Sequence, residues 1–263
     1  MKVSLQFLAS RTAGLLVLLM QGVQKADGHY GFPMLIVNGV VSEWWQYTRP
    51  VGFDSYGEQF FPIQEWTGEP MVCGVNGTKT GHLTSTVKVE AGSTLGFRSI
   101  PATYNKGVIE PRAWDPKADY IHHEGPGQAY MSKAPGALED YEGDGEWFKI
   151  GMSGSTDGMQ WDSYKKTEMN FTIPPTTPPG KYLVRVEHFN ISPYYNLTQM
   201  FINCAHIEVT GAGGGTPGPM IKFPGSYDIE DNSIWLPRAL YHPSKPSDLL
   251  KAYQGPGPKV WTG

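Results

Sequence analysis

Two stretches of the sequence decide the fold: KYLVRVEH, residues 181–188, and QMFINCAHIEV, residues 199–209. Both are rich in apolar and β-branched residues and neither keeps a helical period, so each predicts a β-strand. Because successive side chains of a strand point to opposite faces, the second stretch places Gln199 and Phe201 on one face. Cys204 falls on the other face, where we expect it to point into the core.

The same kind of run recurs before these two stretches. Further strands are predicted at 34–40, 83–90, 93–97 and 168–173. The 22 prolines and 32 glycines of the chain mark turns between the runs. Strands at this spacing predict an all-β protein, an antiparallel β-sandwich with long loops. Residues 220–263 are predicted to form a loop-rich tail that wraps the sandwich.

Residues 1–28 have the features of a secretory signal peptide. Lys2 precedes a compact apolar run at 13–20, and Ala26-Asp27-Gly28 places small residues where a signal peptidase inspects the chain. The predicted organisation is therefore a signal peptide at 1–28 and a single β-sandwich domain at 29–263.

Charge, cysteines and sequons predict a secreted, extracellular monomer. After residue 28 no apolar run approaches the roughly 20 residues that cross a bilayer. The net charge of −4, without any cluster of Lys and Arg, argues against nucleic acid or a membrane as partner. The two cysteines, Cys73 and Cys204, are expected to form one long-range disulfide in an oxidising compartment. Four candidate N-glycosylation sequons agree with secretion: Asn76, Asn170, Asn190 and Asn196.

Cleavage after Gly28 would make His29 the first residue, with a free α-amine. The amine and the ring Nδ1 can close a chelate ring on a metal ion, and a third nitrogen would complete the T-shaped planar arrangement that Cu(II) favours. Candidates for that nitrogen occur in YIHHEGP, residues 120–126. In an extended segment His122 and His123 point to opposite sides, so only one of them can face a given site.

Blocks of sequence along the chain after residue 28 point to one protein family. In order, they are HYGF at 29–32, LIVNG at 35–39, HEGP at 123–126, YMSKAP at 130–135, GDGEWFKI at 143–150, PGKYLVRVE at 179–187, CAHI at 204–207 and PGPKVW at 256–261. Together they resemble the fungal lytic polysaccharide monooxygenases of auxiliary activity family 9, formerly glycoside hydrolase family 61. The resemblance covers essentially the whole mature chain.

The resemblance implies an immunoglobulin-like or fibronectin-like β-sandwich that holds one copper ion on a flat face. It makes His29 and His123 the metal ligands, in an arrangement known as a histidine brace. It also pairs Cys73 with Cys204 in the family disulfide. Tyr253 matches a surface tyrosine that lies flat against a glucan chain, and would belong to the substrate surface.

Two positions close to the metal depart from the family pattern. Where members have Gln-X-Tyr, this chain has Gln199-Met200-Phe201: Gln199 matches the catalytic glutamine that helps hold the oxygen species, and Phe201 packs on the axial side without the tyrosine oxygen. The family strand Glu-X-Ile-X-Leu-His ends here in Ser192, which cannot titrate and so cannot deliver a proton. His188 shares the face of Ser192 in a regular strand, but at about 13 Å it is too far away to replace the histidine.

The implied function is a secreted copper-dependent monooxygenase that oxidatively cleaves β-1,4-glucan, cellulose or a related plant polysaccharide, at C1, C4 or both. Its implied partners are the polysaccharide, an external electron donor and O2 or H2O2. The Ser192 and Phe201 replacements favour an alternative, a copper-binding relative for copper handling or wall binding that does not oxidise polysaccharide. A glycoside hydrolase using paired carboxylates at Glu142, Asp144 and Glu146 is disfavoured, because their glycine-rich setting predicts a turn.

Overall fold

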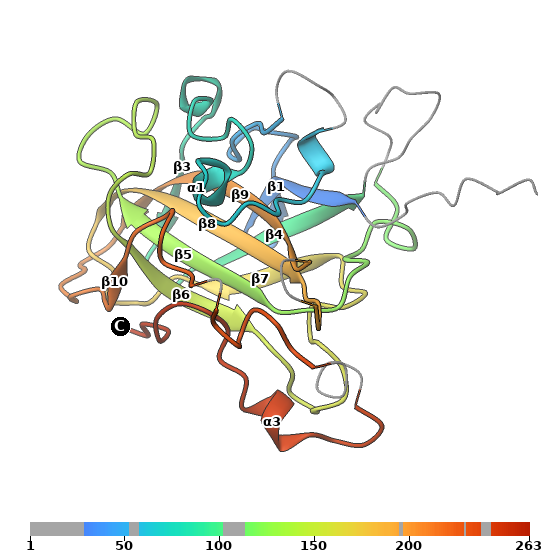
Figure 1. The fold of residues 1–263 in the computed structure, drawn as a ribbon. Helices are drawn as coiled ribbons and strands as arrows, with labels where there is room; N and C mark the ends of the chain where they lie inside the picture. Colours follow the sequence, from blue (N-terminus) through green and yellow to red (C-terminus); the bar gives the residue numbers. More distant parts are fainter. Residues whose placement is uncertain (1–28, 53–57, 102–113, 195–196, 229, 238–242) are drawn as a thin grey trace, which may run out of the picture.

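The computed structural model of the 263-residue chain describes residues 29–52, 58–101, 114–194, 197–228, 230–237 and 243–263. The predicted signal peptide at 1–28 and the sequon at Asn196 lie outside the described residues. The described chain is nearly all β and forms two sheets packed face to face, which confirms the predicted β-sandwich (Figure 1).

The smaller sheet has the strand order β2-β1-β4-β7, with every pair antiparallel. A tight turn joins β1 to β2: Asn38 and Gly39 have φ values of 49° and 84°, the positive-φ pair that an Asn-Gly hairpin turn requires. Its strands are β1 (Tyr30–Val37), β2 (Val40–Val41), β4 (Thr94–Pro101) and β7 (Glu168–Thr172).

The larger sheet has the strand order β10-β6-β5-β8-β9-β3. Its strands are β3 (Val87–Glu90), β5 (Gly127–Lys133), β6 (Trp147–Ser153), β8 (Gly180–Asn190), β9 (Gln199–Thr210) and β10 (Met220–Ile221). β8 and β9 keep their antiparallel register from Gly180↔Val209 to Asn190↔Gln199. The two stretches that predict strands most strongly therefore form the pair that runs through the interior of this sheet.

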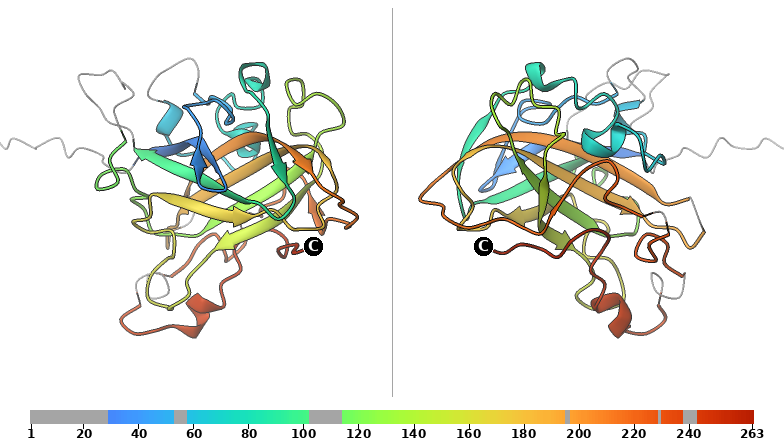
Figure 2. Two further views of the ribbon diagram at one scale, coloured as in Figure 1. Left: turned by 180° about the vertical axis from the view of Figure 1, so that it is seen from behind. Right: turned by 60° about the vertical axis from the view of Figure 1, so that its left-hand side comes forward.

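The helical segments of the described chain are short and lie in the loops (Figure 2). None of the helices in the described residues is long and apolar enough to span a membrane. They are the 3-10 helices η1 (Glu58–Phe60) and η2 (Gly81–Leu83) and the α-helices α1 (Pro70–Cys73) and α3 (Asp248–Lys251).

The larger sheet is buried on both of its faces. Phe201 and Ala205 of β9 belong to the core between the two sheets, together with Phe97 of β4. Cys204 belongs to a second core on the outer face, with Trp147 of β6. The predicted alternation along β9 is therefore correct, and Cys204 does point into a core, but the opposite side is buried as deeply.

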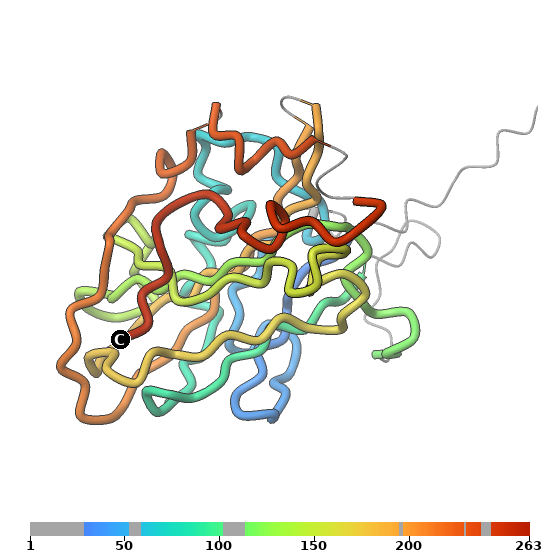
Figure 3. The backbone as a smooth tube through the Cα atoms, turned by 90° about the horizontal axis from the view of Figure 1, so that it is seen from below, coloured from blue at the N-terminus to red at the C-terminus, as the bar shows by residue number. Residues whose placement is uncertain are grey.

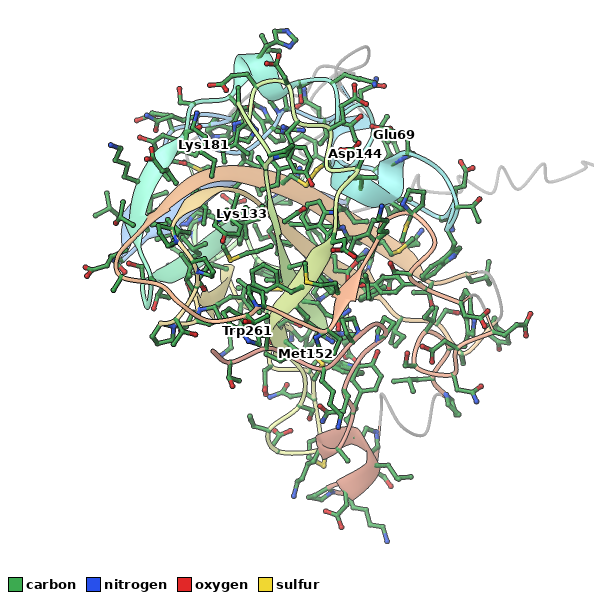
Figure 4. The ribbon with its side chains drawn as sticks, turned by 90° about the vertical axis from the view of Figure 1, so that its left-hand side faces the viewer. Glu69, Lys133, Asp144, Met152, Lys181 and Trp261 are labelled. Carbon is green, nitrogen blue, oxygen red and sulfur yellow. A yellow bond between two sulfur atoms is a disulfide. The ribbon has the colours of Figure 1, made fainter. Side chains whose placement is uncertain are left out.

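The tail after residue 220 packs on the larger sheet, as predicted. Buried Lys149 of β6 donates its Nζ hydrogen to Gln254 O at 2.9 Å, and Trp261 N donates to Lys149 O at 2.8 Å. The Trp261 ring then packs edge-on against Phe148, with centroids 5.3 Å apart. Figure 3 shows the tail running alongside β6, and Trp261 is labelled near Met152 of that strand in Figure 4.

Some details differ from the prediction. The run at 83–90 is not all strand, because it begins in the 3-10 helix η2 and β3 starts only at Val87. β3 lies parallel to β9, so the sandwich is not wholly antiparallel. The residue pattern does not predict β5 or β6, because buried polar side chains interrupt their apolar runs: Gln128, Ser132 and Lys149.

Candidate metal centre

One end of the sandwich brings together the start of β1, the loop before β5 and the start of β9, at the right in Figure 1. Tyr30 of β1 stacks on Phe201 of β9, with ring centroids 4.1 Å apart and an interplanar angle of 18°. The ring of His123, from the loop, lies 5.6 Å from Phe201 and 5.8 Å from Tyr30. We call these three rings, Tyr30, His123 and Phe201, the aromatic layer.

His29 directly precedes Tyr30 of the aromatic layer in the sequence. Its ring packs edge-on against Phe61, with centroids 4.7 Å apart. Its Nδ1 is buried and makes no hydrogen bond with any residue that the structure describes. Buried polar atoms are normally paired, so a lone pair left without a hydrogen is a candidate metal donor.

Side chains alone do not make a full set of metal ligands here. Among the described residues there is no group of three or more His, Cys, Asp or Glu side chains that could hold an ion. A metal bound at His29 and His123 therefore needs a further donor, and the α-amine that cleavage after Gly28 would create lies on His29 itself.

The two histidines of the loop before β5 take different surroundings. His123 joins the aromatic layer, whereas the ring of His122 packs on Tyr120 at 4.3 Å. The chain turns immediately afterwards at Gly125, whose φ is +156° and where a Cβ would lie 1.9 Å from Phe189 O. Only glycine allows this approach to β8, and the approach holds His123 beside the aromatic layer.

Gln199 begins β9, two residues before Phe201, and is half-buried. Its register partner is Asn190, the last residue of β8, and Asn190 Nδ2 donates to Gln199 Oε1 at 2.8 Å. Both amides line a surface hollow of about 420 Å³, together with Ser192 and the exposed Tyr194.

Ser192 serves the loop between β8 and β9. Its Oγ accepts a hydrogen bond from Tyr194 N at 3.1 Å, and its own backbone N donates to Thr198 Oγ1 at 3.0 Å. Ser192 thus shapes a turn and adds no titratable group.

His188 contacts the site from β8, and the residue pattern of the sequence does not reveal this contact. It is fully buried in β8, opposite Phe201, and its Nδ1 lies 2.6 Å from Tyr30 Oη. Burial, and then the nearby His123, lower the pKa of His188 to about 3, so the ring is neutral near pH 7. Strand register is the signal that could have found it, because residues opposite each other in an antiparallel pair share a face and lie about 5 Å apart.

The disulfide predicted between Cys73 and Cys204 is present and joins α1 to β9 across 131 positions of sequence. Both cysteines are fully buried in the outer core. The bond therefore lies on the opposite side of β9 from Phe201, within the outer core.

Tyr253 packs in a small cluster of the C-terminal tail. Its half-buried ring lies edge-on against buried Trp161 at 5.1 Å, and its hydroxyl donates to Ser233 O at 2.6 Å. Burial raises the pKa of Tyr253 above its usual value. Its proposed contact with a glucan chain stays a prediction.

The described sequons have different surroundings. Asn76 is half-buried with a φ of 60°. Asn170 is exposed on β7, an edge strand of the smaller sheet. Asn190 is the partner of Gln199, so a glycan there would stand at the candidate site. Glycosylation at each of them stays a prediction.

Comparison with known proteins shows the family of the chain. The family model for Auxiliary Activity family 9 (formerly GH61) matches residues 29–247. The chain is 37% identical over 255 residues to AA9 family lytic polysaccharide monooxygenase U of Thermothielavioides terrestris, covering 90% of this chain and 94% of that relative. It is 36% identical over 257 residues to AA9 family lytic polysaccharide monooxygenase C of Emericella nidulans, covering 95% and 99%.

Solved structures agree on the fold. The crystal structure of HiLPMO9B has a TM-score of 0.66 and 22% identity, covering 89% of this chain and all (100%) of that one. A structure described as a cellulose-active polysaccharide monooxygenase from M. thermophila has a TM-score of 0.63 and 22% identity, with coverages of 89% and 100%. Family and fold together show that the chain belongs to auxiliary activity family 9, the family of lytic polysaccharide monooxygenases.

Proposed function

We propose that this protein is a secreted, copper-dependent monooxygenase that cleaves β-1,4-glucan chains of cellulose or a related plant polysaccharide, at C1, C4 or both. The observation that carries the proposal is the buried, unpartnered Nδ1 of His29, the residue directly before Tyr30 of the aromatic layer that contains His123. Family membership supports the reaction class.

The donor set fits one copper ion. After removal of residues 1–28, His29 would supply its α-amine and Nδ1, and His123 a ring nitrogen. Three neutral nitrogen donors suit Cu(II). When bound, copper would supply the one-electron redox chemistry that activates O2 or H2O2, with electrons from an external donor.

Phe201 would cover one side of the site. Its ring is buried and packs against the rings of Tyr30 and His123, so the position offers an apolar surface and no oxygen ligand. We expect this surface to exclude water from one side of the metal and to leave the open side to the oxidant and substrate.

Gln199 would position the oxidant. Because Gln199 Oε1 accepts the hydrogen bond from Asn190, its amide NH₂ is the end that can donate towards an oxygen. Ser192 adds no titratable group, so the proton that the reaction consumes would come from water in the adjacent hollow of about 420 Å³.

Two exposed rings near the site would contact the polysaccharide. Phe61 is 45% exposed next to His29, and Tyr194 is 70% exposed at the hollow beside Gln199. Apolar sugar faces pack on aromatic rings, so these side chains are candidates for the substrate surface in addition to Tyr253. Comparison with the cellulose-active relative supports this class of substrate.

Mass spectrometry of the sugars released from amorphous cellulose tests the proposal. Protein that begins at His29, loaded with copper and supplied with a reductant, should release aldonic acids or 4-keto oligosaccharides. A variant with one extra residue before His29, and a His123→Ala variant, should release none. Oxidised sugars from the apo-protein or from either variant would contradict the proposed ligands.

A second candidate function is a copper-binding relative that does not oxidise polysaccharide. The observation that favours it is Ser192, whose hydroxyl is engaged with Tyr194 N where the family places a histidine. Copper bound without any oxidised sugar, across several plant polysaccharides, would support this candidate against the monooxygenase.

A further inference from the structure

A chain of buried hydrogen bonds passes behind the candidate metal centre. It runs from Tyr30 Oη to His188 Nδ1 at 2.6 Å, from His188 Nε2 to Ser163 Oγ at 3.1 Å, and from Ser163 Oγ to Gly125 O at 2.7 Å. Tyr30, His188 and Ser163 are each 1% exposed or less, so water does not compete for these bonds.

The hydrogens of this chain can be placed in only one way. Gly125 O can only accept, so the single hydroxyl hydrogen of Ser163 points to it. Ser163 Oγ must then accept from His188 Nε2, which leaves Nδ1 as the acceptor for the hydroxyl of Tyr30. His188 is therefore the neutral tautomer with its hydrogen on Nε2, and every group in the chain is satisfied.

The two ends of the chain lie beside the two candidate metal ligands. Tyr30 is the residue after His29, and Gly125 is two residues after His123. The segments that carry the ligands come from different parts of the sequence, β1 and the loop before β5. His188, on β8, lies between them and is hydrogen-bonded towards both.

We propose that His188 is a positioning residue of the metal centre: through Tyr30 on one side and Ser163 on the other, it sets the relative placement of the segments that present His29 and His123. The inference rests on the proposed copper site and assigns no contact between His188 and the metal. A bulky apolar residue could fill the same space, but it could not hold either hydroxyl.

Backbone hydrogen bonds also join the segment that contains Ser163 to the loop before β5. Lys165 N donates to Ile121 O at 3.0 Å, and Ile121 N donates to Lys166 O at 2.8 Å. The segment that follows Ser163 is therefore bonded to the loop at Ile121, in addition to the bond from the Ser163 hydroxyl to Gly125 O. Loss of a hydrogen bond that orients a metal ligand typically lowers metal affinity by roughly 10- to 100-fold. We therefore expect a break in this chain of hydrogen bonds to weaken copper binding measurably.

Two variants test the inference with a matched control. Tyr30→Phe removes one hydroxyl and keeps the ring stacked on Phe201, and His188→Leu removes the middle of the chain. Tyr182→Phe is the control, because it also deletes a phenol hydroxyl that is bonded within the protein, to Pro178 O at 2.8 Å. Tyr182 pairs with Ile207, six residues along β9 from Phe201, which is about 20 Å away.

Each protein, beginning at His29, is measured for the Kd of Cu(II), the Cu(II) electron paramagnetic resonance spectrum and the apo-protein Tm. We expect the Kd to rise about tenfold in Tyr30→Phe and in His188→Leu, with a changed spectrum. The double variant should bind Cu(II) no more weakly than His188→Leu alone, because both substitutions interrupt the same chain of hydrogen bonds. Tyr182→Phe should keep the wild-type Kd and spectrum whatever its Tm.

Wild-type Kd and spectrum in both variants, with only the Tm lowered, would overturn the inference and make His188 a packing residue. A change of Kd in Tyr182→Phe as large as in Tyr30→Phe would overturn it too. Failure of the wild-type protein to bind Cu(II) would instead overturn the proposed function itself, so the wild-type titration distinguishes the two failures.

Discussion

Removal of the disulfide between Cys73 and Cys204 should strongly destabilise the fold. The bond closes a loop of 131 positions. In the chain-entropy model, a cross-link of that span lowers the entropy of the unfolded chain, and this stabilises the folded state by about 5 kcal/mol at room temperature. For a domain of this size the loss corresponds to a Tm lower by roughly 10–20 °C.

The metal centre should survive this change as long as the protein remains folded. Cys204 faces the outer core, whereas Phe201 faces the core between the sheets, so the bond and the aromatic layer lie on opposite sides of β9. We therefore expect the Cys73→Ala/Cys204→Ala variant to keep the wild-type Kd for Cu(II) below its lowered Tm.

Urea and thermal unfolding of the wild-type protein and the double variant measure the effect. Because both cysteines are fully buried, the wild-type protein should keep its Tm in the reductant that serves as electron donor. A double variant that unfolds within a few degrees of wild type would refute the entropic argument. Loss of copper binding while the variant is still folded would refute the proposed separation of the bond from the site.

Three further predictions follow from buried groups. Glu187→Gln should lower the free energy of unfolding by about 3–5 kcal/mol, because it leaves the buried guanidinium charge of Arg185 without the carboxylate that lies 2.7 Å away. Urea unfolding measures this change, and full wild-type stability would contradict the prediction. Gly125→Ala should weaken Cu(II) binding because its Cβ would lie 1.9 Å from a backbone oxygen, whereas Gly92→Ala, also at positive φ but with nothing within 4 Å, should not; equal Kd values in the two variants would refute the reasoning. Burial and Arg49 lower the pKa of His206 from 6.5 to about 3. As the pH falls, the unfolded chain therefore takes up this proton before the folded protein does. The contribution of neutral His206 to the free energy of unfolding is complete above pH 6.5 and is lost towards pH 3, by up to about 5 kcal/mol. His206→Gln should flatten that part of the pH profile of unfolding, and an unchanged slope would show that other groups cause it.

Much of the candidate site could be predicted because it depends on short stretches of chain. The alternation along β9 groups Gln199 with Phe201 whatever the rest of the fold does, and two cysteines allow only one intramolecular pair. The chelating potential of His29 depends only on where the chain is cleaved. These features depend on residues that are close together in the sequence, so the local sequence predicts them.

The contact of His188 with the site, by contrast, does not follow from the local sequence. The spacing of about 13 Å along a regular strand, which argues against His188 as a replacement at the position of Ser192, says nothing of what lies across the sheet. Only the register of β8 against β9 places it opposite Phe201, and only the packing of β1 brings the hydroxyl of Tyr30 within 2.6 Å.

The sequence by itself determined the β-sandwich, the central strands and the side chains that share each face of β9. Tertiary structure decided that both faces of the larger sheet are buried, that β3 lies parallel to β9, and that His123 rather than His122 joins the aromatic layer. The physical reason is that a strand's two-residue period records which side chains share a face. What covers that face depends on sheet order, register and loops, which bring together residues more than a hundred positions apart, such as Tyr30 and His188 at a separation of 158.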